Sequence, residues 1–173
     1  KHGLAPAAVY YGEKGYEDLC RRNDIDLVYI ATDWEHHAVV AKCAMENGKN
    51  VADEVPSAMN LEECWQLIDL AEQKQLNCMI LENCCYDWFE MRTLNMAQHG
   101  VFGEILHAQG AYIHNLDEFW DYYWKNPNGS DPEQLGWRLK YNRENRGDIY
   151  ATHGLGPVAQ LLDIHRGDRM ATL

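Results

Sequence analysis

The strongest constraint on the fold is a strand–helix pattern that repeats through the first half of the chain. Each short apolar run rich in β-branched residues is typical of a strand covered on both faces, and each is followed by residues with helical periodicity. The predicted elements are a strand at 26–31, a helix through 38–45, a strand at 50–53, a helix at 61–74 and a strand at 77–81. This order predicts right-handed βαβ units and a parallel sheet.

We expect a domain boundary near Asn83 to Trp88, and the pattern changes after one further helix that ends at Gly100. The expected elements beyond this boundary are a helix at 88–99, a long strand of an antiparallel sheet at 103–114 and a last helix from near 150 to 164. The polar segment 115–148, with a turn at 126–129, is typical of a lid or binding loop. We therefore expect an α/β fold: a parallel sheet followed by part of an α+β domain.

Charge and composition exclude two classes of partner. Acidic residues outnumber basic ones, the net charge is −12 and the sequence pI is about 5.0. A surface this negative repels phosphate backbones and anionic lipid, so we expect neither nucleic acid nor membrane as a partner. The six cysteines form no CxxC pair, and we expect reduced thiols that pack as small apolar groups.

Unusual polar segments follow all three predicted strands. They are Thr32–His37, Glu54–Pro56 and Glu82–Tyr86. Ligands of open parallel sheets bind beyond the carboxyl ends of the strands, so these segments are candidate ligand-binding loops. Each also has a structural explanation: the first could start a helix on a solvated face, the second could end a strand, and the third could form a turn with packed cysteines.

A second cluster of candidate residues lies near the end of the chain. Tyr150 and His153 are three residues apart and would share a face in the first turn of a helix. A phenol beside an imidazole can transfer a proton near neutral pH, although His153 could equally be a buried structural histidine. The histidines show neither HxH nor HExxH spacing, so we expect no metal site.

Several of these segments resemble one known family. They are DLVYIATDWEHH, EVP, LENCCYD, FGEILHAQGAYIH, WRLKYNRENRGDIYATHGLGPVAQ and DIHRGDRM. The chain resembles the Gfo/Idh/MocA group of oxidoreductase-like proteins, and within it glycoside hydrolase family 109, the NAD-dependent α-N-acetylgalactosaminidases. The resemblance spans nearly the whole chain, and ENCCY and YxTHGLGP are its most specific parts.

The resemblance implies an architecture and a chemistry. Residues 1–85 would be the C-terminal part of a Rossmann-type dinucleotide-binding domain, and 86–173 the first part of a substrate domain. NAD would be held permanently, oxidise the sugar at C3 and so acidify the C2 proton. Elimination of the C1 group, addition of water and return of the hydride would complete hydrolysis without the paired carboxylates of ordinary glycosidases.

The resemblance also implies roles for individual residues. Those that would border NAD are Trp34, Glu35, His36, His37, Glu54, Val55, Asn83 and Tyr150. Those that would contact the sugar are Tyr112, Arg138, Tyr150, Ala151, Thr152 and His153. Tyr150 and His153 would be the proton-transfer pair, with Tyr112 assisting and Arg138 orienting substrate oxygens.

Two departures from the wider group matter. Sugar dehydrogenases of the group carry Glu-Lys-Pro where this chain has Glu54-Val55-Pro56, and loss of that lysine favours the hydrolase branch. No GxGxxG follows a strand, so the pyrophosphate-binding unit is missing and we expect a fragment or a degenerate gene product with weak or no catalysis alone.

Two alternatives remain open besides the glycosidase. One is an NAD(P)-dependent sugar dehydrogenase, and the other is a non-catalytic sugar-binding relative. The expected partners are a small-molecule or glycan substrate and a second copy of the chain, which would associate through the sheet of the second domain.

Overall fold

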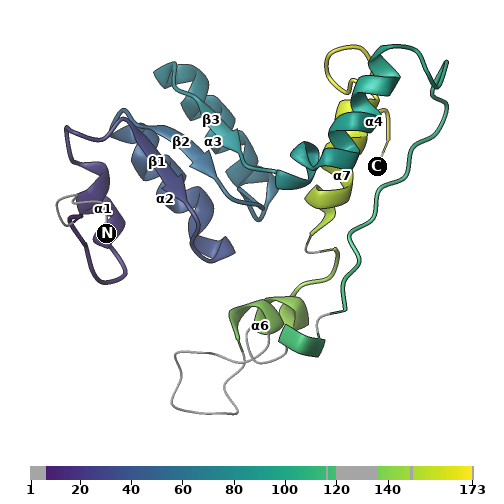
Figure 1. The fold of residues 1–173 in the computed structure, drawn as a ribbon. Helices are drawn as coiled ribbons and strands as arrows, with labels where there is room; N and C mark the ends of the chain where they lie inside the picture. Colours follow the sequence, from purple (N-terminus) through teal and green to yellow (C-terminus); the bar gives the residue numbers. More distant parts are fainter. Residues whose placement is uncertain (1–6, 116, 120–135, 149, 173) are drawn as a thin grey trace. The chain divides into compact units, whose positions relative to one another are not determined.

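The computed structural model describes residues 7–115, 117–119, 136–148 and 150–172, and the chain divides into two compact units, Lys1–Leu81 and Glu82–Leu173. The elements of the first unit are α1 (Gly15–Cys20), β1 (Leu27–Ile30), α2 (Trp34–Glu46), β2 (Asn50–Asp53), α3 (Leu61–Lys74) and β3 (Cys78–Ile80) (Figure 1). Those of the second are η1 (Asn83–Tyr86), α4 (Trp88–Gln98), η2 (Asp117–Phe119), α6 (Trp137–Glu144) and α7 (Ala151–Leu161).

The first unit is built on a parallel sheet with the strand order β1-β2-β3. Val28 pairs with Val51, and Val51 pairs with Cys78. Because both connections between parallel neighbours pass through a helix, α2 and α3 are the crossover helices of two βαβ units. The parallel sheet predicted from the sequence is confirmed, and so are its three strands and the two helices that connect them.

One face of this sheet forms the core of the first unit. Val28 and Ile30 are buried, whereas Leu27 and Tyr29, which alternate with them, are exposed. Side chains of opposite faces alternate along a strand, so the buried pair faces the helices. The buried core also contains Val51 of β2, Leu67 of α3 and, from α2, Ala38, Val40, Ala41, Ala44 and Met45.

Local hydrogen bonds fix where α3 starts. The Asn60 side chain accepts a hydrogen bond from the Glu63 backbone N–H at 2.9 Å, and the Glu63 carboxylate accepts one from the Met59 N–H at 2.7 Å. The reciprocal bond of a standard capping box would go to Asn60 itself, so this is a one-residue variant of that box.

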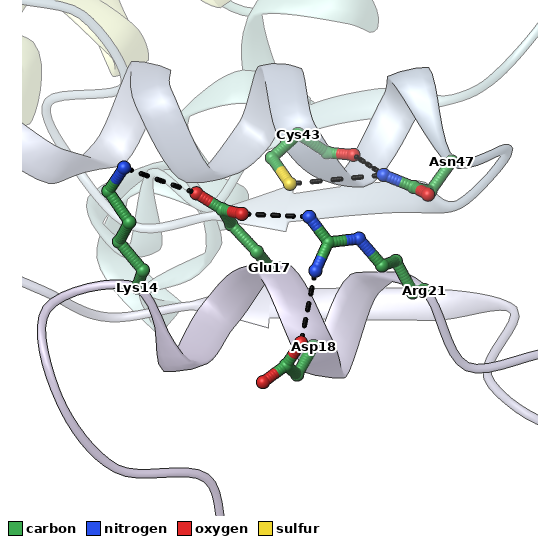
Figure 2. A network of polar contacts seen from close by, with 6 residues as sticks. All are labelled: Lys14, Glu17, Asp18, Arg21, Cys43 and Asn47. Carbon is green, nitrogen blue, oxygen red and sulfur yellow. Dashed lines mark hydrogen bonds and ion pairs between the residues drawn. The ribbon is translucent and has the colours of Figure 1, made fainter.

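The short helix α1, which the sequence pattern did not predict, lies against α2. Figure 2 shows its charged side chains: Arg21 donates to Glu17 at 2.8 Å and to Asp18 at 3.0 Å. These ion pairs are exposed to solvent and contribute little. Burial of Cys20 at the end of the helix holds it to the core instead.

In the second unit, α4 and α7 pack against each other and against η1. Helix α7 begins after Tyr150, as predicted, but ends at Leu161 rather than near Ile164. The chain turns sharply there, with Asp163 in a left-handed conformation at φ 53° that cannot continue a helix.

The strand predicted at 103–114 is not formed. Residues 105–115 follow an irregular path and contain no strand. A strand needs a neighbour to bond with, and the described residues of the second unit include no other strand. The sheet expected to carry self-association is therefore not among the described residues, and the turn predicted at 126–129 also lies outside them.

All six cysteines are free thiols. Cys20 and Cys85 are buried and three others are half-buried, as expected, but Cys64 on α3 is exposed. None of the helices in the described ranges combines the length and apolar character needed to cross a bilayer.

Candidate functional site

The segment that follows β1 turns directly into helix α2. Asp33 caps the helix by accepting a hydrogen bond from the His36 backbone N–H at 3.2 Å, and its carboxylate also bonds the His36 ring. Trp34 and His37 are buried, whereas Glu35 and His36 face solvent. Of the four residues in this segment that were predicted to border NAD, two therefore have solvent-exposed side chains and two have buried side chains.

His37 joins the segments that follow β1 and β2. Its Nδ1 lies 2.8 Å from the Pro56 carbonyl oxygen, and its Nε2 lies 3.2 Å from the Thr32 carbonyl oxygen. The ring is almost completely buried, so these contacts are shielded from water. The segments that follow β1 and β2 therefore lie together at the carboxyl edge of the sheet.

Asp53, the last residue of β2, is fully buried close to His37. Its Oδ1 lies 3.5 Å from Nδ1 of His37, and neither carboxylate oxygen has a hydrogen-bond partner among the described residues. Burial raises the pKa of the Asp53 carboxyl to about 6, against an opposing effect of His37.

Glu54 and Val55 follow directly. Glu54 is half-buried and accepts a hydrogen bond from the Tyr29 hydroxyl, which raises the pKa of that phenol. Val55 is buried, with 8% of its surface exposed. An apolar side chain thus occupies the position at which, by the resemblance described above, sugar dehydrogenases of the wider group would carry a lysine.

These loops suit one half of a dinucleotide better than the other. Glu35 and Glu54 offer carboxylate acceptors of the kind that bind ribose hydroxyls. The start of α2 is capped by the Asp33 carboxylate, whose charge would repel a pyrophosphate. The residues present therefore offer acceptors for ribose hydroxyls, and they do not fit the phosphates.

In the second unit, three predicted catalytic side chains lie together. The Tyr112 ring centroid is 4.2 Å from that of His153 and 5.5 Å from that of Tyr150, and the rings of Tyr150 and His153 stack with an angle of 13° at 5.3 Å. Tyr150 is the residue before α7, and its carbonyl accepts from the His153 N–H. The shared face predicted from their spacing is confirmed.

Arg138 of α6 belongs to the same group. Its Nε donates a hydrogen bond to the Tyr150 hydroxyl oxygen at 3.2 Å, and its guanidinium lies 4.2 Å from the centre of the Trp137 ring. Ala151 and Thr152 form the first turn of α7 between Tyr150 and His153. The structure thus brings every predicted sugar-contacting residue into one part of the second unit.

Two glycines allow this close approach. A Cβ atom on Gly110 would lie 2.3 Å from the carbonyl oxygen of Gly154, and one on Gly154 would lie 3.1 Å from the Gly110 backbone. The segment carrying Tyr112 therefore touches α7 backbone to backbone, which only glycine permits.

One contact of this site, between His153 and Glu82, was not predicted from the sequence. The Nδ1 atom of His153 lies 2.7 Å from Oε1 of Glu82, and both side chains are buried. The two residues are 71 positions apart, so no local spacing could have indicated the pair. Asn83, predicted to border NAD, is exposed at the start of η1.

A cavity of about 300 Å³ lies beside this cluster, between α4, α7 and residues 107–111. His153 and Gly154 contribute to its wall, but Tyr112, Arg138 and Tyr150 do not. We therefore do not assign it to the sugar.

Comparison with known proteins divides the chain in a similar way. The family model described as "Glycosyl hydrolase 109, C-terminal domain" matches residues 86–173, just over half of the chain. The model described as "Oxidoreductase family, NAD-binding Rossmann fold" matches residues 5–82.

Curated relatives match along the whole chain. Glycosyl hydrolase family 109 protein 5 of Phocaeicola vulgatus is 72% identical over 100% of this chain, which covers 33% of that protein. A family 109 protein of Porphyromonas gingivalis is 61% identical over 100% of this chain and 35% of its own length. The chain thus spans about a third of the length of these relatives.

A solved structure gives the fold. An NAD binding oxidoreductase from Klebsiella pneumoniae superposes with a TM-score of 0.51 and 23% identity, covering 54% of this chain and 24% of that one. It supports the Rossmann-type arrangement of the sheet. Since just over half of the chain matches the family's own C-terminal domain and its relatives match from end to end, the chain belongs to glycosyl hydrolase family 109.

Proposed function

We propose that the protein to which this chain contributes is an NAD-dependent glycosidase that releases α-linked N-acetylgalactosamine. The observation that carries the proposal is the group formed by Tyr112, Tyr150 and His153, with Arg138 bonded to Tyr150. Membership of family 109 supports the glycosidase class, and the choice of sugar rests on the resemblance.

The side chains of this group suit proton transfer to and from a sugar. Tyr150 and His153 would exchange protons with ring hydroxyls and with the carbon next to the oxidised position, and Tyr112 would assist. Arg138, whose Nε holds the Tyr150 hydroxyl, would keep the phenol oriented and donate to substrate oxygens. Ala151 and Thr152 would line the sugar site between them.

The cofactor would lie along the loops of the first unit. The exposed or half-buried Glu35, His36 and Glu54 would border it there through their side chains. The buried Trp34, His37 and Val55 would border it through the backbone of the same loops, and Asn83 and Tyr150 would do so from the second unit. Bound NAD would supply hydride acceptance and return at one sugar carbon, so that hydrolysis has no net redox change. The buried Val55 leaves no lysine at the position used by the dehydrogenases of the group.

We also propose that the chain contains parts of two domains with different roles. Residues 1–85 would be the C-terminal part of the dinucleotide-binding domain, and residues 86–173 the beginning of the substrate domain. The two family matches, which meet between 82 and 86, support this division.

The test is an assay of a protein of the relatives' length that contains this chain. We expect cleavage of an aryl α-N-acetylgalactosaminide without net NADH release. Tyr150→Phe and His153→Ala should each lower kcat by about 10²- to 10⁴-fold, the usual contribution of an acid–base group. The exposed Tyr11→Phe and His99→Ala are matched controls that should leave kcat unchanged.

The match to an NAD-binding oxidoreductase family makes a sugar dehydrogenase the second candidate. Steady NADH release from free sugar, without cleavage of the aryl glycoside, would establish it instead. A non-catalytic sugar-binding protein would bind sugar equally well with Tyr150→Phe and His153→Ala, and would show neither reaction.

A further inference from the structure

Glu82 is a buried carboxylate attached to the centre of the ring group. It precedes η1, where its Oε1 accepts the backbone N–H of Cys84 at 3.0 Å and lies 2.7 Å from Nδ1 of His153. Only 6% of Glu82 and 8% of His153 is exposed. Because Oε1 has no proton to give while it accepts a backbone N–H, a His153 ring that donates its Nδ1–H to the same oxygen is the arrangement that satisfies both contacts.

The second oxygen of Glu82 has an unusual environment. Oε2 is buried and has no hydrogen-bond partner among the described residues. Leaving a buried carboxylate oxygen unpaired costs stability, so a fold optimised for stability alone would favour an apolar side chain here. The carboxylate therefore has the characteristics of a group kept for function.

Helix α7 is shaped to admit Glu82. A Cβ atom on Gly156 would lie 2.8 Å from Cγ of Glu82 and 2.9 Å from Sγ of Cys85. The glycine lets the helix approach η1 closely enough for the hydrogen bond to His153 to form. The pair is thus fixed from both sides, by the backbone of η1 and by the missing side chain on α7.

We infer that Glu82 is a positioning residue that holds His153 in the tautomer protonated on Nδ1, which leaves Nε2 as the basic nitrogen for proton transfer with the substrate. A carboxylate that fixes the orientation and tautomer of a catalytic imidazole is a general device of acid–base catalysis. The assignment of a catalytic purpose rests on the proposed function, whereas the tautomer itself does not.

A metal ion is the competing explanation of the same residues. Ligand atoms of Glu82, Cys84 and His153 lie within 4.8 Å of one another. However, the described residues supply three ligand groups here, one fewer than a closed structural zinc site uses. The direct hydrogen bond between Glu82 and His153 also uses two of the three ligand atoms.

The test is a ¹⁵N NMR measurement of histidine tautomers in the chain, with His153→Ala used to assign the resonances. We expect the wild-type ring to be protonated on Nδ1. Glu82→Gln keeps an oxygen acceptor and should keep that tautomer, whereas Glu82→Met removes the acceptor and should allow the Nε2-protonated form. Glu104→Met, the same change at an exposed glutamate, is the control and should have no effect.

Three results of these measurements would overturn the inference. A wild-type ring protonated on Nε2 overturns the inference even if Glu82→Met does not fold, and so does a Glu82→Met ring with an unchanged tautomer. One equivalent of tightly bound zinc that involves His153 also overturns it.

Kinetics of the longer protein test the catalytic purpose separately. Glu82→Met should lower kcat by about 10²-fold or more with KM nearly unchanged, because Glu82 acts through His153 rather than on the sugar. If the wild-type protein cleaves no glycoside but the tautomer result holds, the proposed function fails and the positioning of His153 stands.

Discussion

At the scale of single residues, the charge of Asp53 depends on the fold. Its carboxylate is fully buried without a hydrogen bond among the described residues, and the titratable groups that interact with it include His37, Glu54 and Cys78. The pKa of about 6 in the fold exceeds the ordinary value of 3.8, so the folded chain retains a proton that the unfolded chain releases.

The free energy of unfolding should therefore fall as pH rises between these two pKa values. The contribution of Asp53 to stability is present below about pH 4 and is lost as pH rises through about 6, a change of roughly 3 kcal/mol for a shift of this size. Asp53→Asn should remove that dependence and stabilise the chain at pH 7. Urea unfolding between pH 4 and 7 measures it, in dilute solution because the sequence pI of about 5.0 falls in this range.

Asp69→Asn, at an exposed position of α3, is the control and should follow the wild-type pH dependence. An Asp53→Asn variant that keeps the wild-type slope would show that burial does not govern this carboxyl.

At the scale of elements, the contact between residues 105–115 and α7 is the one that assembles the ring group. It depends on Gly110, where a Cβ atom would lie 2.3 Å from a backbone oxygen that cannot move aside cheaply. Gly110→Ala should therefore separate the two segments and lower the unfolding free energy by about 1–3 kcal/mol, the usual cost of overpacking.

The matched control is Gln109→Ala, one residue earlier and exposed. Urea unfolding compares the two variants, and kcat of the longer protein should fall with Gly110→Ala because Tyr112 moves away from His153. Equal stability of Gly110→Ala and wild type would mean that the contact is not as tight as described.

The elements that could be predicted from sequence are those set by local signals. The strands and helices of the first unit follow from apolar periodicity, although α2 begins at Trp34, after its cap Asp33, and not at 38. The spacing of Tyr150 and His153 likewise placed both rings on one face.

The predictions that failed or were not made concern features that depend on contacts between residues far apart in the sequence. The strand at 103–114 failed because alternation of side chains does not form a strand without a bonding neighbour. The pairing of Glu82 with His153 was missed because the two residues lie 71 positions apart, and only the packing of η1 on α7 brings them together.

At the scale of the whole molecule, the proposed reaction draws on two sets of residues. The first unit would contribute acceptors for ribose hydroxyls, and the second would contribute the acid–base group around His153. The chain spans about a third of the relatives' length, so the reaction is best tested in a protein of their size.

The most direct measurement of the proposed reaction is hydrolysis of an aryl α-N-acetylgalactosaminide in D₂O by such a protein. Loss of the C2 proton with departure of the C1 group, followed by addition of water, should leave one solvent deuterium at C2 of the released sugar, read by NMR. The control is free N-acetylgalactosamine incubated with the same protein in D₂O without the aryl glycoside, which shows whether the released sugar takes up deuterium at C2 after hydrolysis. Complete hydrolysis with no deuterium at C2 would contradict the account, because a glycosidase using paired carboxylates leaves that carbon untouched.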